Sequence, residues 1–159
     1  MVEQLLAKYR VSLLDYLKTK ADDGFYITED NKRFIVDNEI LLKKLLSKST
    51  TVLIRNDRDV EGIILVWKSL GNNLPRYHVK ISANNENVAR DLLTALLWSE
   101  FRQLYIKLKK TSPFIRIFKE KGFVFIGDRG KEILLSLNNT FRKKYVNNQH
   151  NIKDSSDFE

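Results

Sequence analysis

The chain has 159 residues, of which 43% are hydrophobic and 30% are charged, and these values are typical of one soluble globular domain. The absence of cysteine excludes disulfides, thiolate metal sites and a cysteine nucleophile, and two histidines are too few for a histidine metal cluster. No run approaches the ~18 apolar residues that a membrane span needs. The first residues have a helical pattern and not that of a signal peptide. We therefore expect a cytoplasmic protein with no membrane partner.

The net charge of +8 favours an anionic partner, such as nucleic acid, the phosphates of a cofactor or an acidic protein. The charge is densest at Lys107, Lys109 and Lys110 and again over residues 142–144. Lysine is also the common solubilising residue of Lys- and Asn-rich chains, and composition alone does not separate these two explanations.

Hydrophobic periodicity predicts helices and strands in an order typical of a mixed sheet. The predicted elements, in chain order, are a helix over 2–19, a hairpin of 25–28 and 33–36, a helix over 39–47, strands over 51–55, 61–68 and 76–82, a helix over 87–100, a strand over 104–108, a short helix from Pro113 to Gly122, and a hairpin of 123–126 and 132–137. Strand 61–68 is almost wholly apolar, which predicts that both of its faces are covered. We expect one domain over 1–140, including an N-terminal helix over 1–20, and a flexible tail over 141–159 that is basic and then polar.

This order of elements resembles the fold of the GCN5-related N-acetyltransferases (GNAT), and the similarity is best over residues 51–137. Its sharpest part is local: Gly122 and Phe123 stand where many members have Gly-Phe, and Phe118 stands where many have Tyr. The resemblance implies an α+β fold of three layers, with a mixed, mostly antiparallel, twisted central sheet flanked by helices. The family's first strand has no obvious counterpart, and the predicted N-terminal helix or hairpin stands in its place.

The loop before helix 87–100 resembles the family's loop for the CoA pyrophosphate, which binds phosphate through backbone N–H groups at a helix N-terminus. Asn84 and Asn87 replace the family's Gln or Arg and its first Gly, Ala89 fits the pattern, and Glu86 adds a negative charge. The resemblance thus implies acetyl-CoA as cofactor, although Asn-rich turns before helices are also common caps. The residues expected to contact the cofactor are Val79, Ile81, Asn84, Asn85, Asn87, Val88, Ala89, Arg90, Ser112 and Phe118.

The candidate catalytic residues are His78, Glu61 and Tyr105. An imidazole titrates in the range useful for a general base, and a carboxylate at Glu61 would accept the amine proton through water. Family enzymes often use a Tyr to protonate the departing CoA thiolate, which Phe118 cannot do, so Tyr105 or Tyr77 would supply the phenol. For each of these residues, packing or a place on the surface is the alternative role.

The resemblance also implies that two central strands, around residues 79–82 and 104–107, diverge and leave a cleft where a backbone N–H meets the thioester carbonyl. The expected function is acetyl transfer to a primary amine of a small molecule or peptide, by a monomer or homodimer. One alternative is a non-catalytic module that binds nucleic acid or an acidic protein through its basic surface. Another is a homo-oligomeric structural protein that dimerises through its N-terminal helix.

Overall fold

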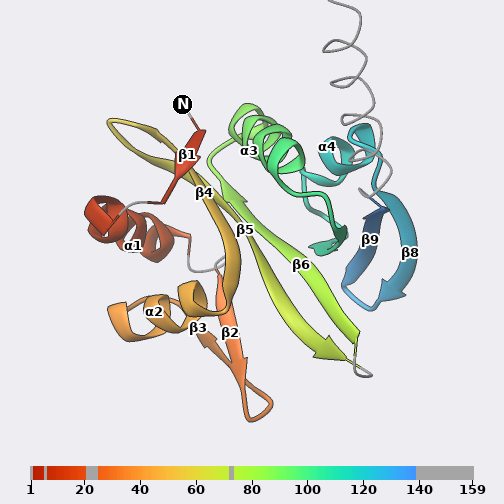
Figure 1. Cartoon of the computed structure of the whole chain (residues 1–159), viewed down its shortest axis with the longest axis horizontal. Coiled ribbons are helices and arrows are strands. Elements are labelled where there is room, and N and C mark those ends of the chain that lie inside the picture. The colour runs from red at the N-terminus through yellow and green to blue at the C-terminus, as the bar shows by residue number, and fades with distance from the viewer. Residues whose placement is uncertain (1, 6, 21–24, 72–73, 139–159) are drawn as a thin grey trace, which may run out of the picture.

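A seven-stranded sheet runs through the molecule, with helices on both of its faces (Figure 1). The computed structural model describes residues 2–5, 7–20, 25–71 and 74–138. In spatial order the strands are β1 (Val2–Gln4), β4 (Ser49–Asp57), β5 (Asp59–Gly71), β6 (Leu74–Ala83), β7 (Gln103–Lys109), β9 (Glu132–Asn138) and β8 (Val124–Arg129). β6 and β7 run parallel, and the other neighbours among the described strands are antiparallel. The mixed, mostly antiparallel sheet expected from the sequence is confirmed.

Helices and a small hairpin complete the layers. They are the short 3-10 helix η1 (Ala7–Tyr9), α1 (Arg10–Thr19), α2 (Glu39–Ser47), α3 (Glu86–Ser99) and α4 (Ile115–Glu120), with β2 (Tyr26–Glu29) and β3 (Lys32–Ile35) as a separate two-stranded sheet. Figure 1 shows α1 and α2 on one side of the central sheet and α3 and α4 on the other. The hairpin β2–β3 lies on the side of α1 and α2.

The middle of β5 explains why both faces carry helices. Ile63, Ile64, Leu65 and Val66 are all fully buried, although consecutive side chains of a strand point to opposite faces. Ile64 and Val66 belong to the apolar cluster under α3 and α4, whereas Ile63 and Leu65 belong to the cluster under α1 and α2. Burying each such side chain contributes about 1.5–3 kcal/mol. The prediction of a strand covered on both faces is therefore confirmed.

Helix α3 is fixed closely against this sheet. The predicted apolar stripe of Val88, Leu92, Leu93, Leu96 and Leu97 is at most 2% exposed. At Gly62 in β5 an added Cβ would lie 2.8 Å from Cγ1 of Val88, so the helix approaches the strand at a point where only glycine fits. This contact sets the position of the α3 N-terminus relative to β5 and β6.

The N-terminal segment differs from the prediction. Residues 2–19 were expected to form one helix, but Val2–Gln4 is strand β1, which pairs antiparallel with β4, and α1 begins only at Arg10. Helical spacing of apolar residues is a weak signal over so few residues, and pairing with the edge of β4 overrides it. β1 thereby supplies the edge strand for which the sequence pattern shows no counterpart. The predicted tail over 141–159 lies outside the described residues.

Candidate functional site

A cleft opens where β6 and β7 separate. The two parallel strands pair only at Tyr77 with Leu104 and at His78 with Tyr105. Beyond these pairs β6 continues to Ala83 and β7 to Lys109 without further pairing between them. β6 stays paired with β5 along its whole length, so it is β7 that diverges. The resulting cavity has a volume of about 870 Å³.

The cleft has an apolar wall and two polar ends. Residues of both diverging strands line it, among them Val79 and Ile81 on β6 and Ile106 and Leu108 on β7. One end is formed by residues 84–86 and 112–114, which we call the α3 end. The other end is formed by Tyr26, Thr28, Arg33, Trp67, His78, Lys80 and Lys107, which we call the hairpin end.

The α3 end contains the N-terminus of that helix. Asn85 is the N-cap: its side-chain oxygen accepts from the backbone N–H of Val88 at 3.0 Å. The backbone N–H of Ala89 donates to the Asn85 carbonyl at 3.1 Å, and the N–H of Asn84 donates to the Glu61 carbonyl at 2.9 Å. Since the first turn of a helix has no intrahelical acceptors, the N–H groups of Glu86 and Asn87 are those left to bind an anion.

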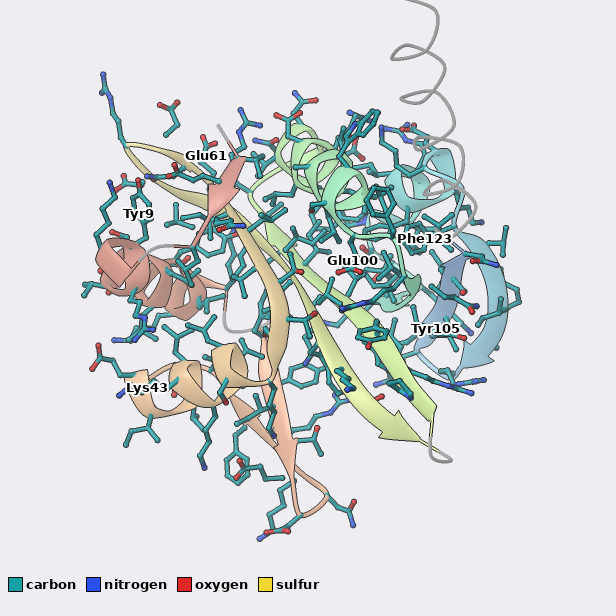
Figure 2. All side chains as sticks on the ribbon, viewed as in Figure 1. Tyr9, Lys43, Glu61, Glu100, Tyr105 and Phe123 are labelled. Atoms are coloured by element: carbon teal, nitrogen blue, oxygen red, sulfur yellow. The ribbon has the colours of Figure 1, made fainter. Side chains whose placement is uncertain are left out.

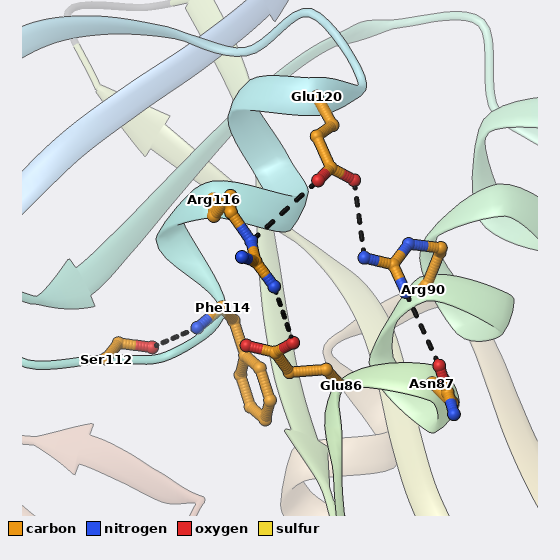
Figure 3. Close-up of polar contacts among 7 residues, drawn as sticks. All are labelled: Glu86, Asn87, Arg90, Ser112, Phe114, Arg116 and Glu120. Atoms are coloured by element: carbon orange, nitrogen blue, oxygen red, sulfur yellow. Dashed lines mark hydrogen bonds and ion pairs between the residues drawn. The ribbon is translucent and has the colours of Figure 1, made fainter.

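A chain of ion pairs joins the start of α3 to α4 (Figure 3). Nη2 of Arg116 lies 2.8 Å from Oε2 of Glu86, and Nη2 of Arg90 lies 3.4 Å from Oε2 of Glu120. Nε of Arg116 also lies 3.9 Å from Oε1 of Glu120. A further bond joins Arg90 to the side chain of Asn87 at 3.4 Å. The negative charge that Glu86 brings to this helix N-terminus is thus compensated across the gap between the helices.

The hairpin end contains His78 in an aromatic stack. Its ring lies 4.8 Å from that of Trp67 in a stacked arrangement and 5.8 Å from that of Tyr105, and its Nε2 is 3.0 Å from Oγ of Ser69. Burial, followed by the charges of Lys107, Arg76 and Lys80, lowers the pKa of His78 below its ordinary value. A neutral imidazole at pH 7 is the form that accepts a proton.

Other predicted catalytic residues lie elsewhere. Glu61 is not part of the cleft lining, because its carboxylate faces Nε of Arg55 at 3.2 Å, and Arg55 also pairs with Asp91 at 2.7 Å. Tyr105 lies beside His78 and below the guanidinium of Arg76, which is 5.4 Å from the Tyr105 ring centre. Figure 2 shows Glu61 and Tyr105 well apart, so the structure does not bring the three candidates together.

The predicted cofactor contacts fall into three groups: residues of the cleft lining, residues of the core, and Asn87 and Arg90, which lie in neither. Val79, Ile81, Asn84, Asn85 and Ser112 line the cleft. Val88, Ala89 and Phe118 do not: their side chains are at most 2% exposed within the core. The Phe118 ring packs edge-on against Phe123 at 5.0 Å, so the aromatic character of this position serves packing. The backbone N–H groups of Val88 and Ala89 are also engaged, because both donate to Asn85.

Ser112 acts at the start of α4. Its Oγ accepts from the backbone N–H of Phe114 at 3.2 Å and closes a turn before the helix. The N-cap position of α4 is Phe114, and no side chain caps this helix. Gly122 ends α4 with a φ of +101°, as predicted. These turns hold residues 112–114 against the α3 end of the cleft.

Sequence reasoning missed Lys80, Tyr26 and Arg33, which meet at the hairpin end. Nζ of Lys80 donates to the carbonyl of Tyr26 at 2.8 Å, and the Arg33 guanidinium lies 4.4 Å from the Tyr26 ring centre. The alternation of His78 and Lys80 along the strand was a usable signal, because it places both side chains on one face. The local sequence pattern did not predict that the β2–β3 hairpin lies against the face of β6 that carries His78 and Lys80.

In the part of the chain that the structure describes, no helix is long and apolar enough to cross a membrane. Nor do the described residues contain a group of three or more His, Asp or Glu side chains that could hold a metal ion.

The sequence matches no protein-family model and no curated protein sequence. Solved structures resemble it closely in fold. The ribosomal-protein-alanine N-acetyltransferase from Brucella melitensis has a TM-score of 0.65 at 11% identity, covering 86% of this chain and 98% of that one. An N-acetyltransferase from Staphylococcus aureus Mu50 has a TM-score of 0.63 at 13% identity, covering 87% and 98%. The yncA protein of Salmonella typhimurium, solved with its cofactor acetyl-CoA, has a TM-score of 0.59 at 13% identity, covering 86% and 92%.

The chain therefore has the GNAT fold, as its element order and Gly122-Phe123 indicated.

Proposed function

We propose that the protein transfers an acetyl group from acetyl-CoA to a primary amine. The observation that carries this proposal is the separation of β6 from β7 after His78. It leaves a cleft of about 870 Å³ that ends at a capped helix N-terminus. The solved structures of this fold whose names describe N-acetyltransferases, and the one that holds acetyl-CoA, support the same reading. We place this activity in the cytoplasm, in a monomer or homodimer.

The residues at the α3 end fit the phosphates of acetyl-CoA. The backbone N–H groups of Glu86 and Asn87 would receive the pyrophosphate, since a helix N-terminus attracts anions through its free donors and its dipole. Arg116 pairs with Glu86, so the Glu86 carboxylate repels a pyrophosphate bound at this loop less strongly. Val79 and Ile81 would line the arm that leads inward from the phosphates.

The hairpin end supplies a base. When bound, acetyl-CoA provides an acetyl thioester, which an unprotonated amine attacks directly. His78 lines the cleft, is neutral at pH 7 and would remove the amine proton. Backbone N–H groups of β6 beyond His78, which β7 leaves unpaired, would stabilise negative charge at the reacting carbonyl oxygen.

The absence of a phenol at Phe118 does not prevent this chemistry. Thiols have pKa values near ~8.5, so a thiolate is a much weaker base than an alkylamine and departs without prior protonation. A Tyr at position 118 would in any case lie in the core, because Phe118 is fully buried against Phe123. Tyr105 lies beside His78 and would assist by holding the imidazole in place.

Thermal unfolding with and without acetyl-CoA tests the proposal. At saturation the cofactor should raise the midpoint by about 2–6 °C, because it binds only the native state. Ala83→Leu, which adds bulk to the cleft lining at the α3 end, should remove most of this shift, whereas Lys43→Met on α2 should keep it. Lys43 is not part of the cleft lining, and Figure 2 shows it on α2, well apart from Tyr105 on β7. An absent shift, or an equal shift from a short RNA, would refute acetyl transfer and favour a polyanion-binding module.

A further inference from the structure

A group of basic side chains surrounds the hairpin end of the cleft. Arg33, Lys80 and Lys107 line this end, Lys48 and Arg76 are near enough to act on Lys80 and His78, and we call the five residues the cation cluster. Arg33, Lys48 and Lys107 act electrostatically on Lys80, while Lys107, Arg76 and Lys80 act on His78. The cluster gathers residues from four elements or their ends: β3, α2, β6 and β7. The repulsion between these positive charges destabilises the folded state.

No carboxylate offsets this repulsion within the described residues, where none of the cluster's side chains forms an ion pair. The carboxylates that do line the cleft are engaged or remote. Glu86 pairs with Arg116 at the α3 end, and Glu132 lies across from Lys109 in the register of β7 and β9. By contrast, Arg55, which lies outside the cleft, is paired with two carboxylates, those of Glu61 and Asp91.

Lys80 is the most confined member of the cluster. Its Nζ donates to the Tyr26 carbonyl at 2.8 Å and lies 5.2 Å from the Tyr26 ring centre and 5.4 Å from that of Trp67. These contacts stabilise the ammonium group, but none of them brings a negative charge to it. Burial first, and then Arg33, Lys48 and Lys107, lowers the pKa of Lys80 to about 8. An anion bound beside Lys80 would stabilise its charged form, which burial and the neighbouring cations now disfavour.

The β2–β3 hairpin brings the second confined cation. Arg33 stands on β3, opposite Thr28 in the hairpin register, and its guanidinium lies 4.4 Å from the Tyr26 ring centre. Tyr26 therefore contacts both Arg33 and Lys80, and the hairpin forms a wall that faces the stacked rings of Trp67 and His78. This wall adjoins the residue that we propose as the base.

We propose that the acceptor amine carries a carboxylate or phosphate near its amino group, and that Lys80, Arg33 and Lys107 bind this anion while the amine faces His78. The inference rests on the proposed function, because it names the acceptor class of the same cleft. Guanidinium and ammonium groups bind both kinds of oxyanion through charge-assisted hydrogen bonds. An amine without such a group would leave the cation cluster uncompensated.

The cofactor's own phosphates do not account for the cation cluster. They belong at the α3 end, and along β6 the backbone from Lys80 to Ala83 alone already spans about 10 Å at the usual rise of an extended strand. The two ends also differ in their donors: backbone N–H groups at Glu86 and Asn87, and charged side chains around Lys80. The cleft thus offers separate sites for two anions.

Calorimetric titration of the acetyl-CoA-saturated protein with inorganic phosphate and, separately, with glutarate tests this inference and distinguishes the two anions. We expect at least one of them to bind wild type, and the Arg33→Gln/Lys80→Met variant to weaken that binding about tenfold or more, since two charged contacts are lost. Lys43→Met removes a lysine remote from the cleft and should leave the affinity within twofold. If Lys80→Met impairs folding, Arg33→Gln with Lys107→Gln carries the same expectation.

Each result decides between the proposals. The inference is overturned if neither anion binds, if Lys43→Met weakens binding as much as the double variant, or if the double variant loses affinity for acetyl-CoA instead. That last outcome would assign the cation cluster to the cofactor. If acetyl-CoA fails to bind wild type while an anion binds in the expected, variant-sensitive way, the proposed function fails and the anion site stands. A preference for phosphate over glutarate, or the reverse, identifies the acceptor's charged group.

Discussion

The two ends of the cleft differ in how they compensate charge. At the α3 end Glu86 meets Arg116, and Arg90 meets Glu120, so each ionised group has a partner across the gap between α3 and α4. At the hairpin end Lys80 faces a carbonyl and two aromatic rings, with further cations around it. The comparison teaches that net charge is a poor guide to this protein, because its binding potential depends on which charges are already paired.

A second difference concerns rigidity. The α3 end is built on a long helix that is capped by Asn85 and packed directly on Gly62. The hairpin end takes Tyr26, Thr28 and Arg33 from β2–β3, a separate two-stranded sheet that contacts the core through Ile27 and the preceding Phe25, and its other residues from the central sheet. A long, tightly packed helix suits the α3 end, where the same cofactor binds in every reaction cycle. A separate hairpin suits the hairpin end, where the acceptor is selected.

The largest expected effect comes from Gly62→Ala, which attacks the support of the α3 end. The new Cβ would lie 2.8 Å from Cγ1 of Val88 and 2.9 Å from the backbone oxygen of Ser82, so α3 must move. We expect a loss of about 1–3 kcal/mol in the free energy of unfolding together with weaker acetyl-CoA binding, measured by urea denaturation and calorimetry. Gly127→Ala is the control, since there the Cβ meets only the flexible end of Arg129. Equal stabilities of the two variants would contradict close packing of α3 on β5.

A smaller and opposite pair of effects should follow from separating Glu86 and Arg116. Glu86→Gln removes a negative charge from the phosphate site and should tighten acetyl-CoA binding about threefold, whereas Arg116→Gln leaves the carboxylate uncompensated and should weaken binding about threefold. Neither change should alter the free energy of unfolding by more than about 1 kcal/mol, because the pair is exposed. Calorimetric dissociation constants check this, and shifts of equal sign in both variants would contradict it.

The smallest expected effect is a pH dependence at the hairpin end. The groups that face Lys80 are Arg33 on β3, Lys48 after α2, Lys107 on β7 and Tyr26 on β2. Glutarate stays fully ionised above pH 7, so its affinity should fall about threefold as Lys80 loses its proton around pH 8. Lys80→Met should flatten this dependence, and titrations at pH 7 and pH 9 measure it.

The lowered pKa of Lys80 should also make the free energy of unfolding rise with pH. The pKa of Lys80 is about 8 in the folded protein against 10.5 as the ordinary value, so between these values the unfolded chain binds more protons. The free energy of unfolding contributed by Lys80 should therefore rise with pH from about 8 to about 10.5. Below pH 8 both states are protonated and the charge of Lys80 opposes folding. Wild type and Lys80→Met should differ in this window, and parallel stability profiles would argue against a confined Lys80.

Much of the fold was predictable from local pattern. The stripe from Val88 to Leu97 identified α3, and the unbroken apolar run of β5 identified a strand covered on both faces. β1 was not predictable, because three residues carry too little periodicity to outweigh a neighbouring helical pattern. Its pairing with β4 is a tertiary effect.

The site was predictable only in part, and for a related reason. The Asn-rich run before the helix was recognised as a possible cap and Glu86 as a negative charge near the expected phosphates, but the sequence did not single out Asn85 as the N-cap. The apolar stripe predicted that Val88 faces the core, but the family motif also placed Val88, Ala89 and Phe118 among the cofactor contacts. Their burial shows that a motif fixes a residue's place in the chain but not the direction of its side chain. Arg33, Lys80 and Lys107 come from segments far apart in the sequence. No local pattern could therefore indicate that they line the same cleft.

The account depends most on the cleft between β6 and β7 being the acetyl-CoA site. Titration of ¹⁵N-labelled protein with acetyl-CoA, followed by amide chemical shifts, tests this directly. The expected result is that the largest shifts lie at residues 79–87 on β6 and the start of α3 and at 106–109 on β7, with little change on α2. Absent shifts, or shifts centred on surfaces outside these two strands, would contradict it.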